Sequence, residues 1–281
     1  MFKFVTYLSV ITLCWGCGDT SAVDDAPMAW EASTAAGTNL KGDTLSEDGR
    51  CVITMCLTGA MNHETPSNHH FRSLCADDRL EGLVQDCGPG GCRDTFDSFL
   101  QFPRLTVYPA LIEALDGNKD GRISDEDPVC EVNLIGFSWG GVNVLSIADH
   151  LSKDQRVPET HKAVRRAVLL DAFQPLSQDR MYVPDNVDRV LSVRHSEAPR
   201  HDCSSRAPLG PYLGLAPICE TSANCKDYDY SQAPFEAFTG SDGGLLLGRD
   251  IGHCDLPYVA HDAVIDFLQD RDFEHRMPTT P

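Results

Sequence analysis

The chain has few positively charged residues and no long apolar run beyond its first 20 residues. Lysine and arginine number 23 against 42 aspartates and glutamates, so the formal net charge is −19 at pH 7. This balance argues against nucleic acid or an anionic membrane surface as an electrostatic partner. No later segment is apolar enough for a membrane-spanning helix, and we find no internal repeat. The 281 residues suffice for one large domain or two small ones.

The first 17 residues have the pattern of an export signal. Lys3 provides a positive start, and residues 4–13 form a short, mostly apolar core. A small residue and then Cys17 follow, and here the chain resembles a bacterial lipoprotein precursor, whose cysteine is lipidated and becomes the new N-terminus. The resemblance implies a lipid anchor on Cys17 as the only attachment to a membrane. The alternative is a plain secretory signal, removed together with Cys14 and Cys17.

The cysteine count agrees with export. Ten cysteines follow Cys17, and this even number could form five disulfides in an oxidising compartment. Lipidation of Cys14 would leave Cys17 without a partner, which favours Cys17 as the lipidated residue. Cys87 and Cys92 flank a turn rich in glycine and are close enough in sequence for a local disulfide.

The body of the chain alternates strand and helix patterns. Residues 18–50 lack apolar periodicity and are predicted to be a flexible acidic tether, followed by one folded domain over residues 51–275. Strands are predicted at 51–57, 82–86, 131–136, 163–170 and 187–193, and helices near 95–100, 107–115, 141–151 and 256–268. This alternation predicts an α/β domain with a mainly parallel sheet.

The segment Gly-Phe-Ser-Trp-Gly-Gly at residues 136–141 has the G-x-S-x-G pattern of a nucleophile elbow. It follows an apolar strand and precedes a helical pattern, as a strand–turn–helix elbow requires. Gly136 and Gly140 leave room where the backbone bends, which would hold Ser138 in a strained, exposed position. We therefore predict Ser138 as a catalytic nucleophile; the alternative is a glycine-rich structural turn.

With Ser138 followed by Asp171 and then His253, the chain resembles the α/β-hydrolase superfamily over residues 51–270. The resemblance implies a three-layer α/β-hydrolase fold. Little chain precedes residue 51, so the sheet is expected to be trimmed at its N-terminal strands, as in small secreted lipases and cutinase-like esterases.

The resemblance implies that His253 is the general base, because it lies in a loop before the terminal helix. His261, inside that helix, and His195, at a strand end, are the alternatives. Asp171 is predicted as the acid that orients the base, whereas a place one strand later would select Glu197 or Asp202. A turn or helix-capping role is the alternative for Asp171.

The oxyanion hole is expected to use backbone N–H groups. The resemblance implies that one donor is the N–H of Trp139, the residue after the nucleophile. The second is expected from the loop after the first strand, at Ala60 or Met61. The chain has Thr58-Gly59 where most relatives have His-Gly, so the identity of this second donor is open.

Residues 116–127 match a twelve-residue calcium loop. Oxygen ligands are predicted from the first, third, fifth, seventh and twelfth positions, which are Asp116, Asn118, Asp120, Arg122 and Asp127. Gly121 provides the tight turn, and the aspartate at the last position is typical of dockerin-like loops. The loop precedes a strand whose far end carries Ser138, so a bound Ca²⁺ is expected to be structural. The alternative is an acidic surface turn.

These features predict an exported serine hydrolase that cleaves carboxylic esters, acting on a small-molecule or lipid ester as a monomer. Residues 199–248 are predicted to be a lid or acyl-binding wall, or else a disulfide-tied surface excursion. The apolar candidates for that wall are Leu209, Tyr212, Leu213, Leu215, Phe235 and Phe238. Two other functions stay open: a calcium-dependent binding protein of the cell surface without turnover, and an acyltransferase.

Overall fold

The structure is a computed structural model. It describes residues 40–41, 45–46, 48–58, 66–87, 103–173, 181–197, 213–219, 224–239 and 243–279. The chain divides into two compact units, Met1–Thr34 and Ala35–Pro281, and all described residues belong to the second. The predicted signal, with Cys17, and the predicted helix near 95–100 lie outside the described residues.

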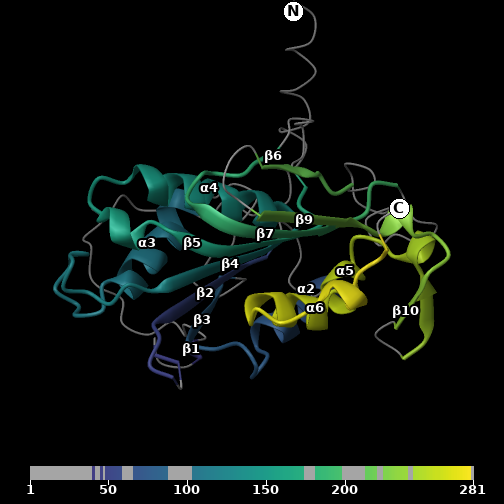
Figure 1. Cartoon of the computed structure of the whole chain (residues 1–281), viewed down its shortest axis with the longest axis horizontal. Coiled ribbons are helices and arrows are strands. Elements are labelled where there is room, and N and C mark those ends of the chain that lie inside the picture. The colour runs from purple at the N-terminus through teal and green to yellow at the C-terminus, as the bar shows by residue number, and fades with distance from the viewer. Residues whose placement is uncertain are drawn as a thin grey trace, which may run out of the picture. The chain divides into compact units, whose positions relative to one another are not determined.

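A seven-stranded sheet forms the centre of the second unit (Figure 1). Six strands are parallel, and the edge strand β1 is antiparallel to its neighbour. In spatial order the strands are β1 (Leu40–Lys41), β3 (Leu83–Cys87), β2 (Val52–Leu57), β4 (Glu131–Phe137), β5 (Val164–Leu170), β7 (Val187–Arg194) and β9 (Asn224–Asp229).

Helices cover both faces of this sheet. On one side lie α3 (Pro103–Leu115) and α4 (Trp139–Lys153); on the other lie α2 (Pro66–Cys75), α5 (Leu256–Val259) and α6 (His261–Leu268) (Figure 1). Successive buried strand residues alternate between the two apolar clusters, as Leu134 and Ile135 of β4 do. The structure confirms the predicted three-layer α/β-hydrolase fold. In the described part of the chain only the two-residue β1 precedes β2, in agreement with a trimmed sheet.

Shorter elements complete the unit. Two small sheets pair β6 (Met181–Tyr182) with β8 (Pro217–Ile218), and β10 (Ala237–Thr239) with β11 (Leu245–Leu247). The 3₁₀ helices are η1 (Glu159–His161), η3 (Tyr230–Gln232), η4 (Gly248–Asp250) and η5 (Glu274–Arg276). No described helix is long and apolar enough to cross a bilayer.

The fold extends beyond both predicted limits. Leu40 and Lys41 pair with β3, and Leu45 forms a bridge to Cys51, so the end of the predicted 18–50 tether belongs to the sheet. An edge strand this short leaves no periodicity in the sequence. At the other end Met277 is buried beyond the predicted limit at residue 275.

The prediction of a lid or surface excursion over residues 199–248 missed the last strand of the sheet, β9. Its sequence, Asn-Cys-Lys-Asp-Tyr-Asp, has no apolar run because β9 lies at the edge, with β7 as its one partner among the described strands. Of the predicted wall, Leu209 and Tyr212 lie outside the described residues. Phe238 is partly buried and packs against the core residue Tyr230, while Phe235 is 77% exposed.

The predicted helix over 256–268 divides at Ala260 into α5 and α6. The predicted helix over 107–115 begins earlier, at Pro103, and continues through Pro109. Pro103 is the first residue of this helix, where proline is well tolerated because the N–H that it lacks has no partner in the helix. Pro109 lies in the interior, where a proline removes one backbone hydrogen bond.

Disulfides connect neighbouring elements. Cys51 pairs with Cys130, Cys56 with Cys75 and Cys219 with Cys225, and Cys254 is also disulfide-bonded. Cys92, the predicted partner of Cys87, lies outside the described residues. The first bond joins the starts of β2 and β4, and the second ties the end of β2 to the end of α2. Cross-links of this kind restrict the unfolded chain.

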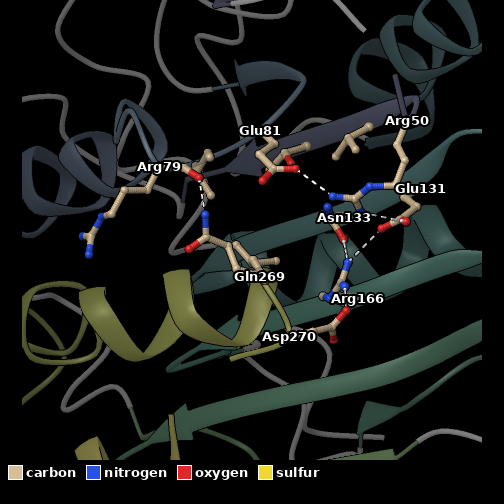
Figure 2. Close-up of a pocket in the computed structure, with 12 residues that line it drawn as sticks. Arg50, Arg79, Glu81, Glu131, Asn133, Arg166, Gln269 and Asp270 are labelled. Carbon is tan, nitrogen blue, oxygen red and sulfur yellow. Dashed lines mark hydrogen bonds and ion pairs between the residues drawn. The ribbon is translucent and has the colours of Figure 1, made fainter. Parts of the chain in front are cut away.

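The buried Arg166 links the end of α6 to the amino ends of the central strands (Figure 2). Arg166 of β5 is only 2% exposed and forms ion pairs with Glu131 (3.2 Å) and Asp270, the latter just after α6. Asp270 also pairs with Arg189 of β7. A cavity of about 60 Å³ lies beside them. Because a buried guanidinium needs charged partners, Asp270 ties the chain after α6 to β5 and β7.

We expect Asp270→Asn to lower the free energy of unfolding by about 2 kcal/mol, because Arg166 stays buried and loses a charged partner. Asparagine tolerates the positive φ of Asp270 (56°), so the change isolates the charge. Urea denaturation measures it. The matched control, Asp188→Asn, breaks the exposed pair with Arg165 and should cost no more than about 0.5 kcal/mol. Equal effects in the two variants would contradict the assigned role of Asp270.

Candidate active site

Ser138 forms the single-residue turn between β4 and α4. Its φ of 59° and ψ of −127° are unusual for a residue with a side chain. Backbone hydrogen bonds hold this conformation: the Ser138 N–H donates to Leu170 O (2.8 Å), and the Phe173 N–H donates to Ser138 O (3.2 Å). The serine is therefore fixed against the turn that follows β5.

Two glycines let the elbow close. A Cβ on Gly136 would collide with the carbonyl of Gly140, and a Cβ on Gly140 would collide with the carbonyl of Leu57 at the end of β2. The strand before the serine, the helix after it and the neighbouring strand thus approach more closely than side chains allow. The sequence pattern around Ser138 has a steric cause in this packing.

Asp171 follows β5 directly and is fully buried. Its Oδ2 lies 2.6 Å from His253 Nδ1 and 2.9 Å from His195 Nδ1, and its Oδ1 accepts the backbone N–H of His195 (3.1 Å). Gly214 lies close to the carboxylate, because a Cβ there would collide with Oδ1. The carboxylate is thus surrounded by nitrogen donors and excluded from solvent.

These contacts keep the buried carboxyl ionised. Burial raises the pKa of Asp171, but the charge and hydrogen bond of His195, followed by those of His253, outweigh it and lower the pKa to about 2. At neutral pH Asp171 therefore carries a negative charge. It can orient an imidazole and stabilise its protonated form, which is the work of the acid in a catalytic triad.

His253 lies in the turn before α5 and is buried. Its ring stacks on that of Phe137, with centroids 4.6 Å apart and an interplanar angle of 30°. Because Phe137 precedes Ser138, this stack puts the imidazole beside the elbow. The structure thus brings Asp171 and His253 into contact and places both beside the backbone turn that carries Ser138.

The alternative candidates divide into three cases. His261 pairs with Asp77 instead (Nε2–Oδ2, 2.7 Å). Glu197 is exposed and its N–H donates to Ser231 Oγ (3.0 Å), while Asp202 lies outside the described residues. His195 is different, because it contacts the same carboxylate as His253. The sequence indicates His195 only as a rival base, because its contact with Asp171 depends on β7 lying next to β5 in the sheet.

The oxyanion hole is described in part. Trp139 is the first residue of α4, where N–H groups point out of the helix and favour negative charge. Thr58 is buried directly after β2, but Ala60 and Met61 lie outside the described residues. The Trp139 N–H is therefore the donor that the described residues position at the elbow.

The predicted calcium loop is a hydrogen-bonded turn between α3 and β4, at the opposite end of β4 from Ser138. Asp116 accepts the N–H groups of Asp120 (3.2 Å) and Gly121 (2.8 Å), and Asn118 also accepts that of Asp120 (2.9 Å). Asp120 accepts the N–H of Arg122 (2.9 Å), and Gly121 has a φ of 86°. The predicted oxygen donors therefore share one tight turn.

Asp127 closes this loop from the inside. It is buried and accepts the N–H groups of Ser124 (2.8 Å) and Asn118 (3.1 Å), which lower its pKa, the Ser124 bond most of all. In the described part of the chain no group of three or more His, Cys, Asp or Glu side chains is arranged to hold a metal ion. Calcium binding by the loop thus stays a prediction.

No protein-family model matches the sequence, and no curated protein matches it. Among solved structures, the chain has a likeness to a dienelactone hydrolase-like promiscuous phosphotriesterase from metagenomic libraries. The two are 13% identical, and the match covers 79% of this chain and 87% of the other. The TM-score is 0.34, so the fold is assigned from the strand order and helix layers of this chain alone.

Proposed function

We propose that the protein is an exported serine hydrolase that cleaves carboxylic esters through an acyl-enzyme on Ser138. One observation carries the proposal: the buried Asp171–His253 pair lies beside a serine held in a strained turn between strand and helix. A buried, ionised carboxylate bonded to an imidazole has a clear chemical use next to a serine hydroxyl. The substrate class is a small-molecule or lipid ester.

In the first half of the reaction, Ser138 Oγ bonds to the ester carbonyl carbon and His253 takes the hydroxyl proton. With Nδ1 bonded to Asp171, the nitrogen that acts as base is Nε2. Asp171 stabilises the imidazolium, and the Trp139 N–H stabilises the oxyanion. When the tetrahedral intermediate collapses, the imidazolium gives its proton to the departing alcohol. The acyl group stays on Ser138.

In the second half, water attacks the acyl-enzyme while His253 takes a proton from it. Collapse releases the carboxylic acid, and Ser138 recovers its proton from His253. An acyltransferase would differ only in this half, with an alcohol or amine in place of water. A cell-surface binding protein would have no use for the buried Asp171–His253 pair.

The first test is labelling with a fluorophosphonate probe, which reacts only with an activated serine. We expect the adduct on Ser138 by peptide mass mapping, and we expect Ser138→Ala to lower kcat for a p-nitrophenyl ester on the order of 10⁴-fold or more. Ser146→Ala, in the helix that follows, is the matched control and should keep both labelling and turnover. No adduct on the folded wild-type protein would reject the proposal in favour of a binding protein. Acyl transfer to added alcohol in preference to water would indicate the acyltransferase.

We also propose that residues 116–127 hold a structural Ca²⁺. The donor set fits this ion, with carboxylate or amide oxygens of Asp116, Asn118, Asp120 and Asp127 and the backbone carbonyl of Arg122. The loop precedes the start of β4, whereas Ser138 follows its end. The ion would brace the connection between α3 and the sheet and take no part in the chemistry.

Calcium should raise the melting temperature of the wild-type protein, because an ion that binds only the folded state stabilises it by about 2.7 kcal/mol at 100 times its Kd. Asp116→Ala should abolish the shift. Glu126→Ala, which removes an acidic side chain of the same loop outside the predicted ligand positions, should keep it. Differential scanning calorimetry with calcium and with a chelator makes the comparison. An unchanged wild-type melting temperature would refute the ion.

The third part of the proposal is export with a lipid anchor on Cys17. Its support is the sequence of the first 17 residues together with the disulfides, which are typical of oxidising compartments. In a bacterial host fed labelled palmitate, we expect the full chain to carry the label in the membrane fraction. Cys17→Ser should lose the label. A full chain without label, released in soluble form, would instead indicate a plain secretory signal.

A further inference from the structure

His195 contacts both oxygens of the Asp171 carboxylate. Its backbone N–H donates to Oδ1 at 3.1 Å, and its ring Nδ1 lies 2.9 Å from Oδ2. One residue therefore spans the carboxylate and opposes its rotation about the bond to Cβ. His253 uses Oδ2 as well, at 2.6 Å, so two imidazoles meet at one oxygen.

The surroundings hold His195 in place. It is fully buried at the end of β7, next to β5, and its carbonyl accepts the N–H of Gly214 (3.0 Å). The preceding residue, Arg194, forms ion pairs with Asp227 (3.0 Å) and Asp229 (3.0 Å) of β9. The backbone of His195 is thus anchored through its own carbonyl oxygen and through the ion pairs of the preceding Arg194. Gly214 lies against the Asp171 carboxylate.

We propose that His195 is a positioning residue of the catalytic site: its Nδ1–H donor and its backbone N–H together fix the plane of the Asp171 carboxylate, and the fixed carboxylate aligns His253. This inference rests on the proposed function. An ionised carboxylate only accepts hydrogen bonds, so the proposal requires a proton on Nδ1 of both imidazoles. Without the ring donor, Asp171 keeps its charge but can turn away from His253.

Three variants separate the donor from the bulk of the ring. In His195→Asn the side-chain amide nitrogen can take the place of Nδ1 and donate to Oδ2. His195→Gln carries its amide one bond farther out, and His195→Leu fills space without a donor. We expect kcat to fall on the order of 10²-fold in the Leu and Gln variants, as misplacement of a catalytic group by about 1 Å can cause. KM should change little, and the Asn variant should recover most of the kcat.

A kcat in the Leu variant equal to that of the wild type would overturn the proposal, and so would an Asn variant as slow as the Leu variant. Melting temperatures identify a variant that fails to fold. ¹⁵N NMR of histidine-labelled wild-type protein gives a readout that needs no variant to fold and no turnover. We expect the His195 and His253 signals both to show a protonated Nδ1. An unprotonated Nδ1 on His195 at neutral pH would contradict the proposal.

These measurements keep the two proposals apart. If the wild-type protein neither labels with the fluorophosphonate nor hydrolyses esters, the proposed function fails whatever the NMR shows. If the wild type is active and the Leu variant is equally active, only the role of His195 fails.

Discussion

The fully buried charge of Asp171 is the constraint on which the rest of the site depends. A carboxylate without water keeps its charge only when N–H groups surround it, since burial alone would raise its pKa. Here the donors come from the end of β7 and from the turn before α5, and the carboxylate itself follows β5. The position of Asp171 therefore requires a precise arrangement of three segments that are distant in sequence.

The sheet supplies this arrangement. β4, β5 and β7 are neighbours, and their carboxyl ends deliver Ser138, Asp171 and His195 side by side. Charges near the amino ends of the strands stabilise the fold instead, since Asp270, just after α6, pairs with Arg166 and Arg189. His253 precedes α5 and α6, and Asp270 follows α6. This segment is therefore held at its start by the contact of His253 with Asp171 and at its end by the ion pairs of Asp270. The proposed catalytic residues thus follow the carboxyl ends of these strands, and the stabilising ion pairs lie near the amino ends.

Much of the fold was predictable because its central strands are buried on both faces. β2, β4, β5 and β7 appear in the sequence as apolar runs, and these predictions agree with the structure to within one or two residues. β1 and β9 were missed because edge strands need no such run, and β9 is mostly polar. The Asp171–His253 pair was expected from a resemblance. The contact of His195 was not, because strand order decides it and no local pattern encodes strand order.

In the proposed reaction, the same contacts bear on how protonation of His253 is accommodated. When His253 takes a proton, the charge that stabilises it is on an oxygen already shared with His195. A carboxylate with one partner could rotate to follow the imidazole. The Asp171 carboxylate instead accepts the His195 backbone N–H at Oδ1 and lies 2.9 Å from the His195 ring at Oδ2, and these contacts oppose that rotation. The ring of His253 must then be the group that is aligned with the carboxylate. Its stack on Phe137, the last residue of the strand before Ser138, provides this alignment. Ser138 and Asp171 are thus positioned by adjacent strands, and His253 by its contacts with Phe137 and Asp171, so the proposed reaction would need little rearrangement.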